Sequence, residues 1–200
     1  MQNFHGQHDE EKIILQYVGD KKDGKYIDIG AGHSSEISNT AYFYNLGWKG
    51  LCFEPTPEQS TPEDWKIVRP RDIFLPIALS DHEGEIEMIS TGCLDSFIGE
   101  IYSTTERKIQ GPNRTVQCMT MMKVLEQYPE FKEVDFMSLD VDTYEHKIFA
   151  GMNFEIFKPK LICVEYMVRN HDFRKNWEYL LLPYYEPKEV ITGNCFYLRK

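Results

Sequence analysis

The sequence has little of several features that define whole classes of protein. No apolar run approaches the roughly 20 residues of a membrane span, and MQNFHGQHDEEK has neither the basic region nor the apolar core of a secretory signal. Basic residues are also few, because 22 Lys and Arg stand against 32 Asp and Glu. A phosphate-backbone interface needs a basic face, and RPR at 69–71, the nearest thing to one, is interpreted as a solvated loop. We therefore expect a cytoplasmic protein with neither a membrane nor a nucleic acid as partner.

Cysteine is present without a pattern. The five cysteines are an odd number and show no CxxC spacing, so we expect neither a disulfide framework nor a zinc site. Cys52, Cys163 and Cys195 lie in apolar, strand-like runs, where a free cysteine packs as a small hydrophobic side chain. This usage predicts a reducing compartment.

What is present is an alternation of strand-like and helix-like segments over 200 residues, a length that fits one domain. Strands are predicted at 26–30, 50–55, 72–80, 85–90, 134–141 and 159–166, with a final hairpin of 185–190 and 195–200; helices are predicted at 9–18, 35–46, 120–128, 144–152 and 172–182. Residues 91–117 have no clear period and are interpreted as a long functional excursion. The order predicts an α/β fold with a mostly parallel sheet, flanked by helices, and a C-terminal antiparallel hairpin.

In such a sheet, ligands bind beyond the carboxyl ends of the strands. Acidic or small residues stand at these ends: Asp28 with Gly30 and Gly32, then Glu54, then Ala78, Leu79 and Ser80, then Asp140 and Asp142, then Glu165. Four strand ends with carboxylates on one edge are more than solubility requires. The sequence therefore predicts a polar ligand site at this edge.

The first of these ends, YIDIGAG, predicts the kind of ligand. Gly30 and Gly32 allow a sharp turn and a close approach, and Glu54 follows Gly32 at the distance typical of a ribose-binding acid. A dinucleotide fold usually needs a third glycine where this chain has Ser35. Asp28 instead suits a cationic cofactor such as S-adenosylmethionine, although it could also cap nearby loop amides.

Several stretches together resemble the FkbM family of S-adenosylmethionine-dependent methyltransferases. They are HGQHDEEKIILQY, YIDIGAG, SNTAYFYNLGWKGLCFEPTPE, RPRDIFLPIALSDHEGEIEM, VDFMSLDVDTYEHKIFAGM and PKLICVEY. The resemblance implies a Rossmann-like class I methyltransferase fold and O-methylation of sugars or other hydroxylated metabolites. It implies that Asp28, Gly30 and Gly32 form the cofactor loop, that Glu54 holds the ribose hydroxyls, and that Ala78, Leu79 and Ser80 border the adenine. The excursion at 91–117 would then set the choice of acceptor.

The chain departs from the family at two places. The family commonly has Asn where Gly32 stands, and a glutamate–glycine pair where this chain has Asp142 and Thr143. The second departure lies near the presumed acceptor, so the acceptor is not identified by the resemblance.

Asp140 is the main candidate for catalysis because it ends a central strand. Methyl transfer to a hydroxyl needs positioning and removal of a proton, which a carboxylate could supply directly or by holding a divalent metal. Glu165 could complete an acidic cluster with Asp140 or meet Arg169 or a loop amide. Asp142 and Glu145 have the spacing of a helix-capping box, an equally good explanation for Asp142.

Histidines and the N-terminal stretch give weaker signals. His146, on a predicted helix at the same edge, could be a base or a packed surface residue; His33, in the cofactor loop, could touch the ligand, and His171 could line the acceptor pocket. Gln7 and Asp9 could fold over the cofactor, although Asp9 could equally cap the first helix.

Two other functions stay open from the sequence. The DVD stretch at 140–142 resembles the metal-binding D-x-D of sugar-nucleotide glycosyltransferases. A methyltransferase fold that has lost activity and serves as an interaction module is the non-enzymatic alternative. Intact Asp28, Gly30, Gly32 and Glu54 argue against decay of the cofactor site.

Overall fold

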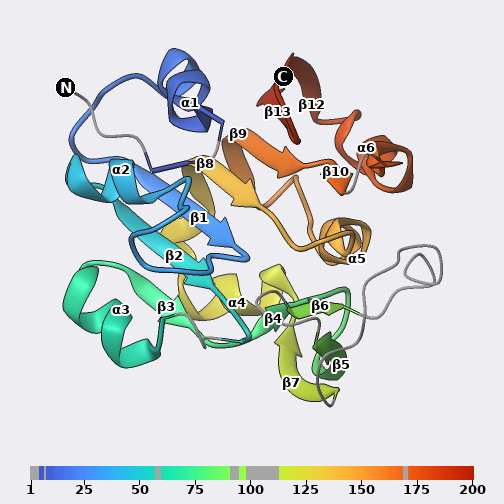
Figure 1. Cartoon of the computed structure of the whole chain (residues 1–200). Coiled ribbons are helices and arrows are strands. Elements are labelled where there is room, and N and C mark those ends of the chain that lie inside the picture. The colour runs from blue at the N-terminus through green and yellow to red at the C-terminus, as the bar shows by residue number, and fades with distance from the viewer. Residues whose placement is uncertain (1–4, 7, 57–59, 91–94, 98–112, 169–170) are drawn as a thin grey trace.

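The computed structural model describes residues 5–6, 8–56, 60–90, 95–97, 113–168 and 171–200 (Figure 1). Its centre is a seven-stranded sheet with the order β12-β13-β9-β8-β1-β2-β3. The strands are β1 (Lys25–Ile29), β2 (Lys49–Phe53), β3 (Ile73–Leu75), β8 (Glu133–Leu139), β9 (Lys158–Glu165), β12 (Tyr185–Val190) and β13 (Asn194–Arg199). The first five run parallel, and β13 lies antiparallel between β9 and β12. The predicted parallel sheet and terminal hairpin are confirmed.

Helices cover both faces of this sheet, because successive residues of each strand point to opposite sides. In β1, Tyr26 packs in a cluster with residues of α1 (Glu10–Val18), α2 (Ala41–Asn45) and α3 (Pro62–Val68). Its neighbour Ile27 packs in another cluster with residues of α4 (Met121–Gln127), α5 (Glu145–Ala150) and α6 (Glu178–Leu181). Two short 3-10 turns, η2 (Pro129–Phe131) and η3 (Arg174–Asn176), complete the second layer.

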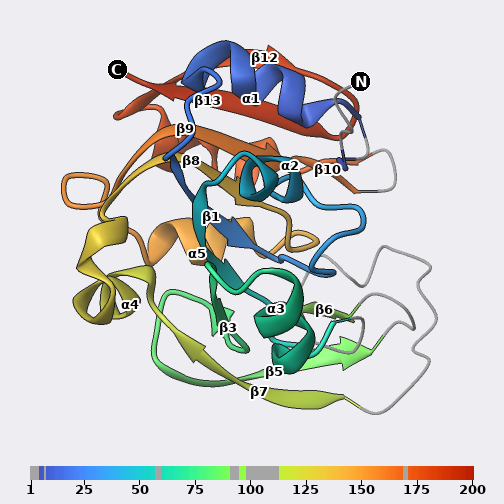
Figure 2. The same cartoon turned by 90° about the vertical axis from the view of Figure 1, so that its left-hand side faces the viewer.

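A second sheet branches from the first where one long strand was predicted. The run 72–80 forms β3 and, after Pro76 and Ile77, β4 (Ala78–Leu79), which belongs to a four-stranded sheet of order β4-β7-β5-β6. The other members are β5 (Gly84–Ser90), β6 (Asp95–Phe97) and β7 (Arg114–Met119). Proline cannot donate to a ladder, so the single predicted strand was wrong at this point. Figures 1 and 2 show this sheet on the lower side of the central one.

Three further predictions need correction. The helix predicted at 35–46 begins only at Ala41, and the helix predicted at 172–182 is divided between η3 and α6. The excursion predicted at 91–117 contains β6 and most of β7, and its other residues, 91–94 and 98–112, lie outside the described part of the chain. A small antiparallel pair, β10 (Met167–Val168) and β11 (His171–Asp172), follows β9.

Cysteine use agrees with the prediction where the structure describes it. Cys52, Cys118, Cys163 and Cys195 are free and buried, whereas Cys93 lies outside the described residues. Of the helices in the described ranges, none has the length and apolar character that crossing a bilayer demands.

Candidate functional site

The turn after β1 fits closely between two neighbouring strands. The amides of Gly30 and Ala31 both donate to the carbonyl of Phe53 at the end of β2, at 3.0 Å each. Gly30 has a φ of 77°, and a Cβ there would lie 1.8 Å from the carbonyl oxygen of Asp140. The turn therefore requires glycine at position 30, both for its backbone conformation and for its contact with β8.

Gly32 differs, because its Cα faces open space. Its φ is 53°, and no described atom lies within 4 Å of a Cβ built on it. Its amide donates to Oε2 of Glu54 at 3.1 Å, so Glu54 lies beside the turn as predicted. The Oε1 atom of Glu54 accepts from the amide and the hydroxyl of Thr56, at 2.9 and 2.8 Å.

These two residues fit an adenosine-type cofactor. A carboxylate can accept about four hydrogen bonds, and donors among the described residues supply three of those to Glu54. The remaining acceptor site could bind one ribose hydroxyl. A second ribose hydroxyl would take the place of the Thr56 hydroxyl. The open space at Gly32 leaves room for the ligand to approach the backbone.

His33 supports the loop with its ring. Its Nδ1 atom accepts from the amides of Ser35 and Glu36 at 3.2 and 3.1 Å. The helix predicted to begin at residue 35 is absent here, because α2 begins six residues later. The imidazole binds amides of the segment that precedes α2, and contact between His33 and a cofactor stays a prediction.

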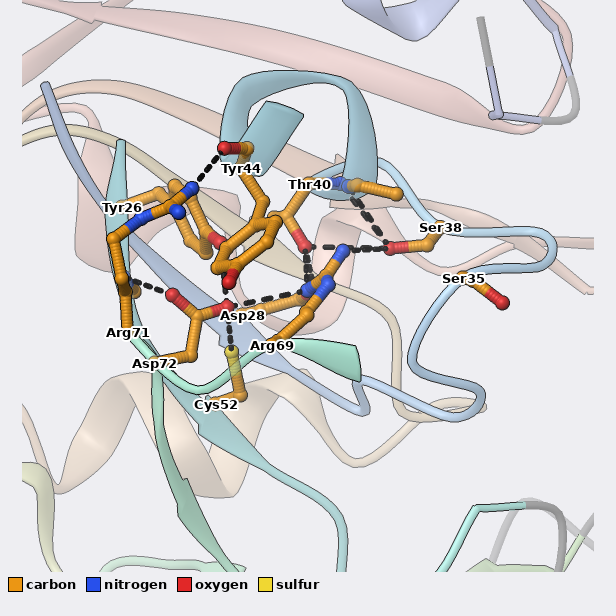
Figure 3. A network of polar contacts seen from close by, with 12 residues as sticks. Tyr26, Asp28, Ser35, Ser38, Thr40, Tyr44, Cys52, Arg69, Arg71 and Asp72 are labelled. Carbon is orange, nitrogen blue, oxygen red and sulfur yellow. Dashed lines mark hydrogen bonds and ion pairs between the residues drawn. The ribbon is translucent and has the colours of Figure 1, made fainter. Parts of the chain in front are cut away.

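Asp28 lies beneath the loop in a buried polar network (Figure 3). Its Oδ2 accepts from the Thr40 hydroxyl at 2.5 Å, and burial raises the pKa of Asp28 to about 6. Arg69 joins the same network with a side chain that is 1% exposed. The interpretation of RPR as a solvated loop was therefore wrong for Arg69, although Pro70 and Arg71 are exposed. Asp28 supports the loop through a hydroxyl and not, as one alternative had it, through loop amides.

Ala78, Leu79 and Ser80 meet the start of α5. Ala78 is buried with Met88 and Cys118, and Val141 and Tyr144 pack against this cluster. The hydroxyls of Ser80 and Tyr144 are 3.0 Å apart. Ala78, Leu79 and Ser80 are 2%, 1% and 1% exposed, and contact between these residues and an adenine stays a prediction.

Asp140 and Glu165 form a pair at the ends of β8 and β9. The Asp140 amide donates to the carbonyl of Ile29 at 3.0 Å, and its side chain is hydrogen-bonded to that of Glu165. The surrounding protein raises the pKa of Asp140 to about 6, and desolvation together with the charge of Asp140 raises that of Glu165 to about 10. Asp140 nevertheless remains open to solvent. At neutral pH the pair holds one proton, mainly on Glu165, and the predicted acidic cluster is confirmed in geometry.

Glu145 lies beneath this pair. Its side chain is 1% exposed, and burial raises its pKa to about 8. It accepts from the amide of Thr143 at 3.3 Å. The capping box predicted for Asp142 and Glu145 is wrong, because α5 has Tyr144 as its N-cap residue.

A profile of the Methyltransferase FkbM domain matches residues 28–191. The chain belongs to the FkbM methyltransferase family. The match includes the glycine turn, Glu54 and the pair of Asp140 and Glu165, and it confirms the family resemblance. No curated protein matches the sequence.

Solved structures agree on the fold. A methyltransferase FkbM from Methylobacillus flagellatus KT is 12% identical with a TM-score of 0.56, and the alignment covers 88% of this chain and 44% of that one. The 1,6-didemethyltoxoflavin-N1-methyltransferase of Burkholderia thailandensis, solved with 1,6-didemethyltoxoflavin and S-adenosylhomocysteine, is 10% identical with a TM-score of 0.52. That alignment covers 96% of this chain and 76% of the other. The chain thus has the class I methyltransferase fold and spans less than half the length of the first relative.

The departure from the FkbM pattern at 142–143 coincides with strain. Asp142 and Thr143 have φ values of 53° and 88°, which branched residues such as threonine rarely adopt. The glycine of the family pattern would suit this backbone. Backbone strain of this kind persists where the surrounding structure fixes it, often at functional sites, and the residue types alone gave no sign of it.

His146 has a defined tautomer. Its Nδ1 lies 3.2 Å from the carbonyl oxygen of Thr143, which can only accept, so Nδ1 carries the proton and Nε2 is left with its lone pair. Burial lowers the pKa of His146, so the ring is neutral at pH 7. This state fits a base, and the catalytic role of His146 stays a prediction.

The N-terminal stretch lies against the loop that follows the glycine turn. The carbonyl of His5 accepts from the amide of Ser38 at 3.1 Å, and Glu11 accepts from the amides of His5 and Gly6 at 2.6 and 2.7 Å. Gln7 lies outside the described residues. Asp9 pairs with Lys12 at 2.8 Å, and within the described chain its side chain makes no cap to α1, which corrects that alternative.

His171 and Arg169 stay candidates from the sequence. His171 is exposed on β11, so a place in the acceptor pocket stays a prediction. Arg169 lies outside the described residues, so its contact with Glu165 also stays a prediction.

The acidic cluster predicts how stability depends on pH. The pKa values of Asp140, Glu145 and Glu165 are raised to about 6, 8 and 10, so the folded chain binds more protons than the unfolded one between pH 4.5 and 10. The free energy of unfolding should therefore fall as pH rises through this window. We expect the melting temperature to fall from pH 5 to pH 9, and Glu165→Gln, which mimics the protonated acid, to flatten this fall. Thermal denaturation of both, with the exposed Glu155→Gln as control, checks this; equal slopes for all three would contradict it.

Proposed function

We propose that the chain transfers a methyl group from S-adenosylmethionine to a hydroxyl group of a sugar, glycan or other small metabolite. The observation that carries this proposal is the hydrogen bond from Gly32 to Glu54, since it holds a carboxylate that could accept from a ribose hydroxyl beside an open glycine turn. Membership of the FkbM family and the class I fold support it. The solvent-accessible Asp140, directly after β8, supplies a carboxylate that could interact with the methyl acceptor.

The cofactor half of the site would act through binding. The backbone at Gly32 leaves space for the ligand, and Glu54 would accept from a ribose hydroxyl. The acidic strand ends favour a ligand with positive charge. When bound, S-adenosylmethionine supplies a methyl group on a positively charged sulfur.

The acceptor half would act through proton removal. The hydroxyl of the acceptor would lose its proton to Asp140 as its oxygen takes the methyl group that S-adenosylmethionine would supply, with the sulfur as leaving group. Glu165 keeps its own proton and donates to Asp140, which orients the carboxylate. His146, with a free Nε2, is the alternative base. Such a positioned base contributes about 100- to 10,000-fold to the rate.

No observation favours a metal-dependent glycosyltransferase. Among the residues that the structure describes, no group of three or more His, Cys, Asp or Glu side chains is arranged to hold a metal ion. The Asp140 side chain of the DVD stretch is hydrogen-bonded to Glu165. We therefore propose no step through a metal.

Isothermal titration with S-adenosylhomocysteine tests the proposal. We expect binding by the folded chain, and turnover when S-adenosylmethionine is offered with a panel of free and glycosylated alcohols. Absence of binding at high micromolar ligand would overturn the proposal. Binding without methylation of any acceptor would favour the interaction module instead.

Replacement of Glu54 separates the cofactor site from the rest. Glu54→Ala removes the acceptor for Gly32 and for the ribose, and a hydrogen bond to a charged group contributes about 1.5–3 kcal/mol. We expect the Kd of S-adenosylhomocysteine to rise about 10- to 100-fold. The exposed Glu155→Ala serves as the control in the same titration and should bind as the unchanged protein does. An unaltered Kd in folded Glu54→Ala would remove Glu54 from the site.

A further inference from the structure

Arg69 is a buried arginine that contacts the segment after the glycine turn, residues 33–40. Its Nη1 donates to the Thr40 hydroxyl at 2.9 Å, and its Nη2 donates to the Ser38 hydroxyl at 3.0 Å. Its Nη1 also lies 3.5 Å from Oδ2 of Asp72. Figure 3 shows the guanidinium between these three partners. Arg69 thus connects the segment that follows the glycine turn to the chain that leads into β3.

The electrostatics of this network depend on the same residue. The side chains of Asp28 and Asp72 are buried, and Arg69 is the cation that faces both. Thr40 donates to Asp28 and accepts from Arg69, so its hydroxyl links the two side chains by hydrogen bonds. Uncompensated buried charge is costly; without Arg69, Asp28 would lose the cation that faces it, and Asp72 would keep only that of Arg71.

The arginine holds a loop that would not keep its shape alone. Ile37, next to Ser38, is 70% exposed and has a φ of 48°, a conformation that costs a branched residue energy. Ser38 in turn accepts from the amide of Ala41 at 3.2 Å, at the start of α2. The contacts of Arg69 with Ser38 and Thr40 therefore hold the residues that directly follow the strained Ile37.

A lysine could not replace these contacts. The two guanidinium nitrogens reach Ser38 and Thr40 at once, while the plane of the group lies 4.9 Å from the centre of the Trp65 ring. The single ammonium group of lysine has neither two forked nitrogens nor a planar face that could stack on the Trp65 ring.

We infer that Arg69 is a positioning residue for the cofactor: it holds residues 33–40 in the shape that places the glycine turn and Glu54 for binding. This inference rests on the proposed function. It assigns a role in cofactor affinity to a residue that contacts neither the glycine turn nor Asp140.

Arg71 offers a matched control for the test. It lies two residues away, and its guanidinium is 3.9 Å from the centre of the Tyr44 ring and donates to the Tyr44 carbonyl. It thus packs on Tyr44 of α2, as Arg69 does, but within the described part of the chain it makes no hydrogen bond with residues 33–40. Arg71→Met removes a stacked side chain and a charge that, like that of Arg69, acts on Asp72, but it leaves the hydrogen bonds to Ser38 and Thr40 in place.

The experiment compares Arg69→Met with Arg71→Met by titration with S-adenosylhomocysteine, by steady-state kinetics and by hydrogen exchange of the unliganded chain. We expect Arg69→Met to raise the Kd and the KM for S-adenosylmethionine about tenfold, with a smaller change in kcat. Amides of residues 34–41 should exchange faster. Arg71→Met should match the unchanged protein in all three, and Arg69→Lys should fall between.

Each outcome decides the inference. Unchanged affinity and unchanged exchange in folded Arg69→Met would overturn it, as would equal losses in Arg71→Met. If neither Arg69 variant folds, Ser38→Ala, which removes one hydroxyl that Arg69 reaches, gives the same two measurements. If the unchanged protein does not bind S-adenosylhomocysteine, the proposed function fails, whereas the exchange data still show whether Arg69 holds the loop.

Discussion

Gly30→Ala is expected to lower the melting temperature by about 10 °C or more and to abolish binding of S-adenosylhomocysteine. The new Cβ would lie 1.8 Å from the carbonyl oxygen of Asp140 and 2.9 Å from its carbonyl carbon. Neither side can yield easily, because Gly30 donates to Phe53 and the amide of Asp140 donates to Ile29. The positive φ of Gly30 adds strain of about 1–2 kcal/mol. Separation of β1 from β8 at this point would move the glycine turn away from Glu54.

Gly32→Ala is the matched control for this prediction. It shares the positive φ, at 53°, but no described atom lies within 4 Å of the added Cβ. The substitution should therefore lower the free energy of unfolding only by the backbone strain, about 1–2 kcal/mol. The melting temperature should fall by less than about 8 °C. Thermal denaturation followed by circular dichroism measures both variants. Equal stability of the two would show that the contact with Asp140 does not limit the turn.

Asp140→Asn is expected to lower kcat at least about 100-fold while the Kd of S-adenosylhomocysteine changes less than about threefold. The amide is similar in shape to the carboxylate but cannot take up the acceptor's proton. The same role predicts a pH profile. Because the pKa of Asp140 is raised to about 6 and a base acts deprotonated, kcat should rise with pH through this value.

Asp142→Asn gives the comparison within the same stretch. If Asp140 alone takes the proton, Asp142→Asn should keep most of the activity and lose less than about tenfold. If DVD instead binds a metal, both variants should lose activity together and manganese should change the loss. A fall in cofactor affinity larger than the fall in kcat for Asp140→Asn would contradict its assignment to the acceptor half.

The sequence predicted the fold where strands and helices are long and regular. The run around Asp28 and the run that ends at Glu165 became β1 and β9 because apolar side chains fill both faces of a parallel strand. Prediction failed where one residue changes the path of the chain: Pro76 ends β3 and sends the next strand into a second sheet. It failed again before Ala41, where the ring of His33 and the hydroxyl of Ser38 bind amides that a helix would have used.

The site could be predicted only as far as strand ends could be located. Glu54 and Asp140 follow β2 and β8, Glu165 ends β9, and a parallel sheet brings such strand ends to one edge. Arg69 could not be found in this way, because its neighbours Pro70 and Arg71 are exposed and its burial arises from contacts 29 and 31 residues earlier in the chain. The strain at Thr143 likewise depends on how β8 passes into α5.

The position of β13 has a consequence for the order in which the chain folds. This strand is the last of the sheet in sequence, yet it lies between β9 and β12 and pairs with both. Asn194 at its start donates to Glu10 in α1, 184 residues earlier, at 2.9 Å. During synthesis, Glu10 of α1 can acquire this partner only after β13 has been made. Contacts this distant in sequence slow folding, so the packing of α1 on the sheet is completed late.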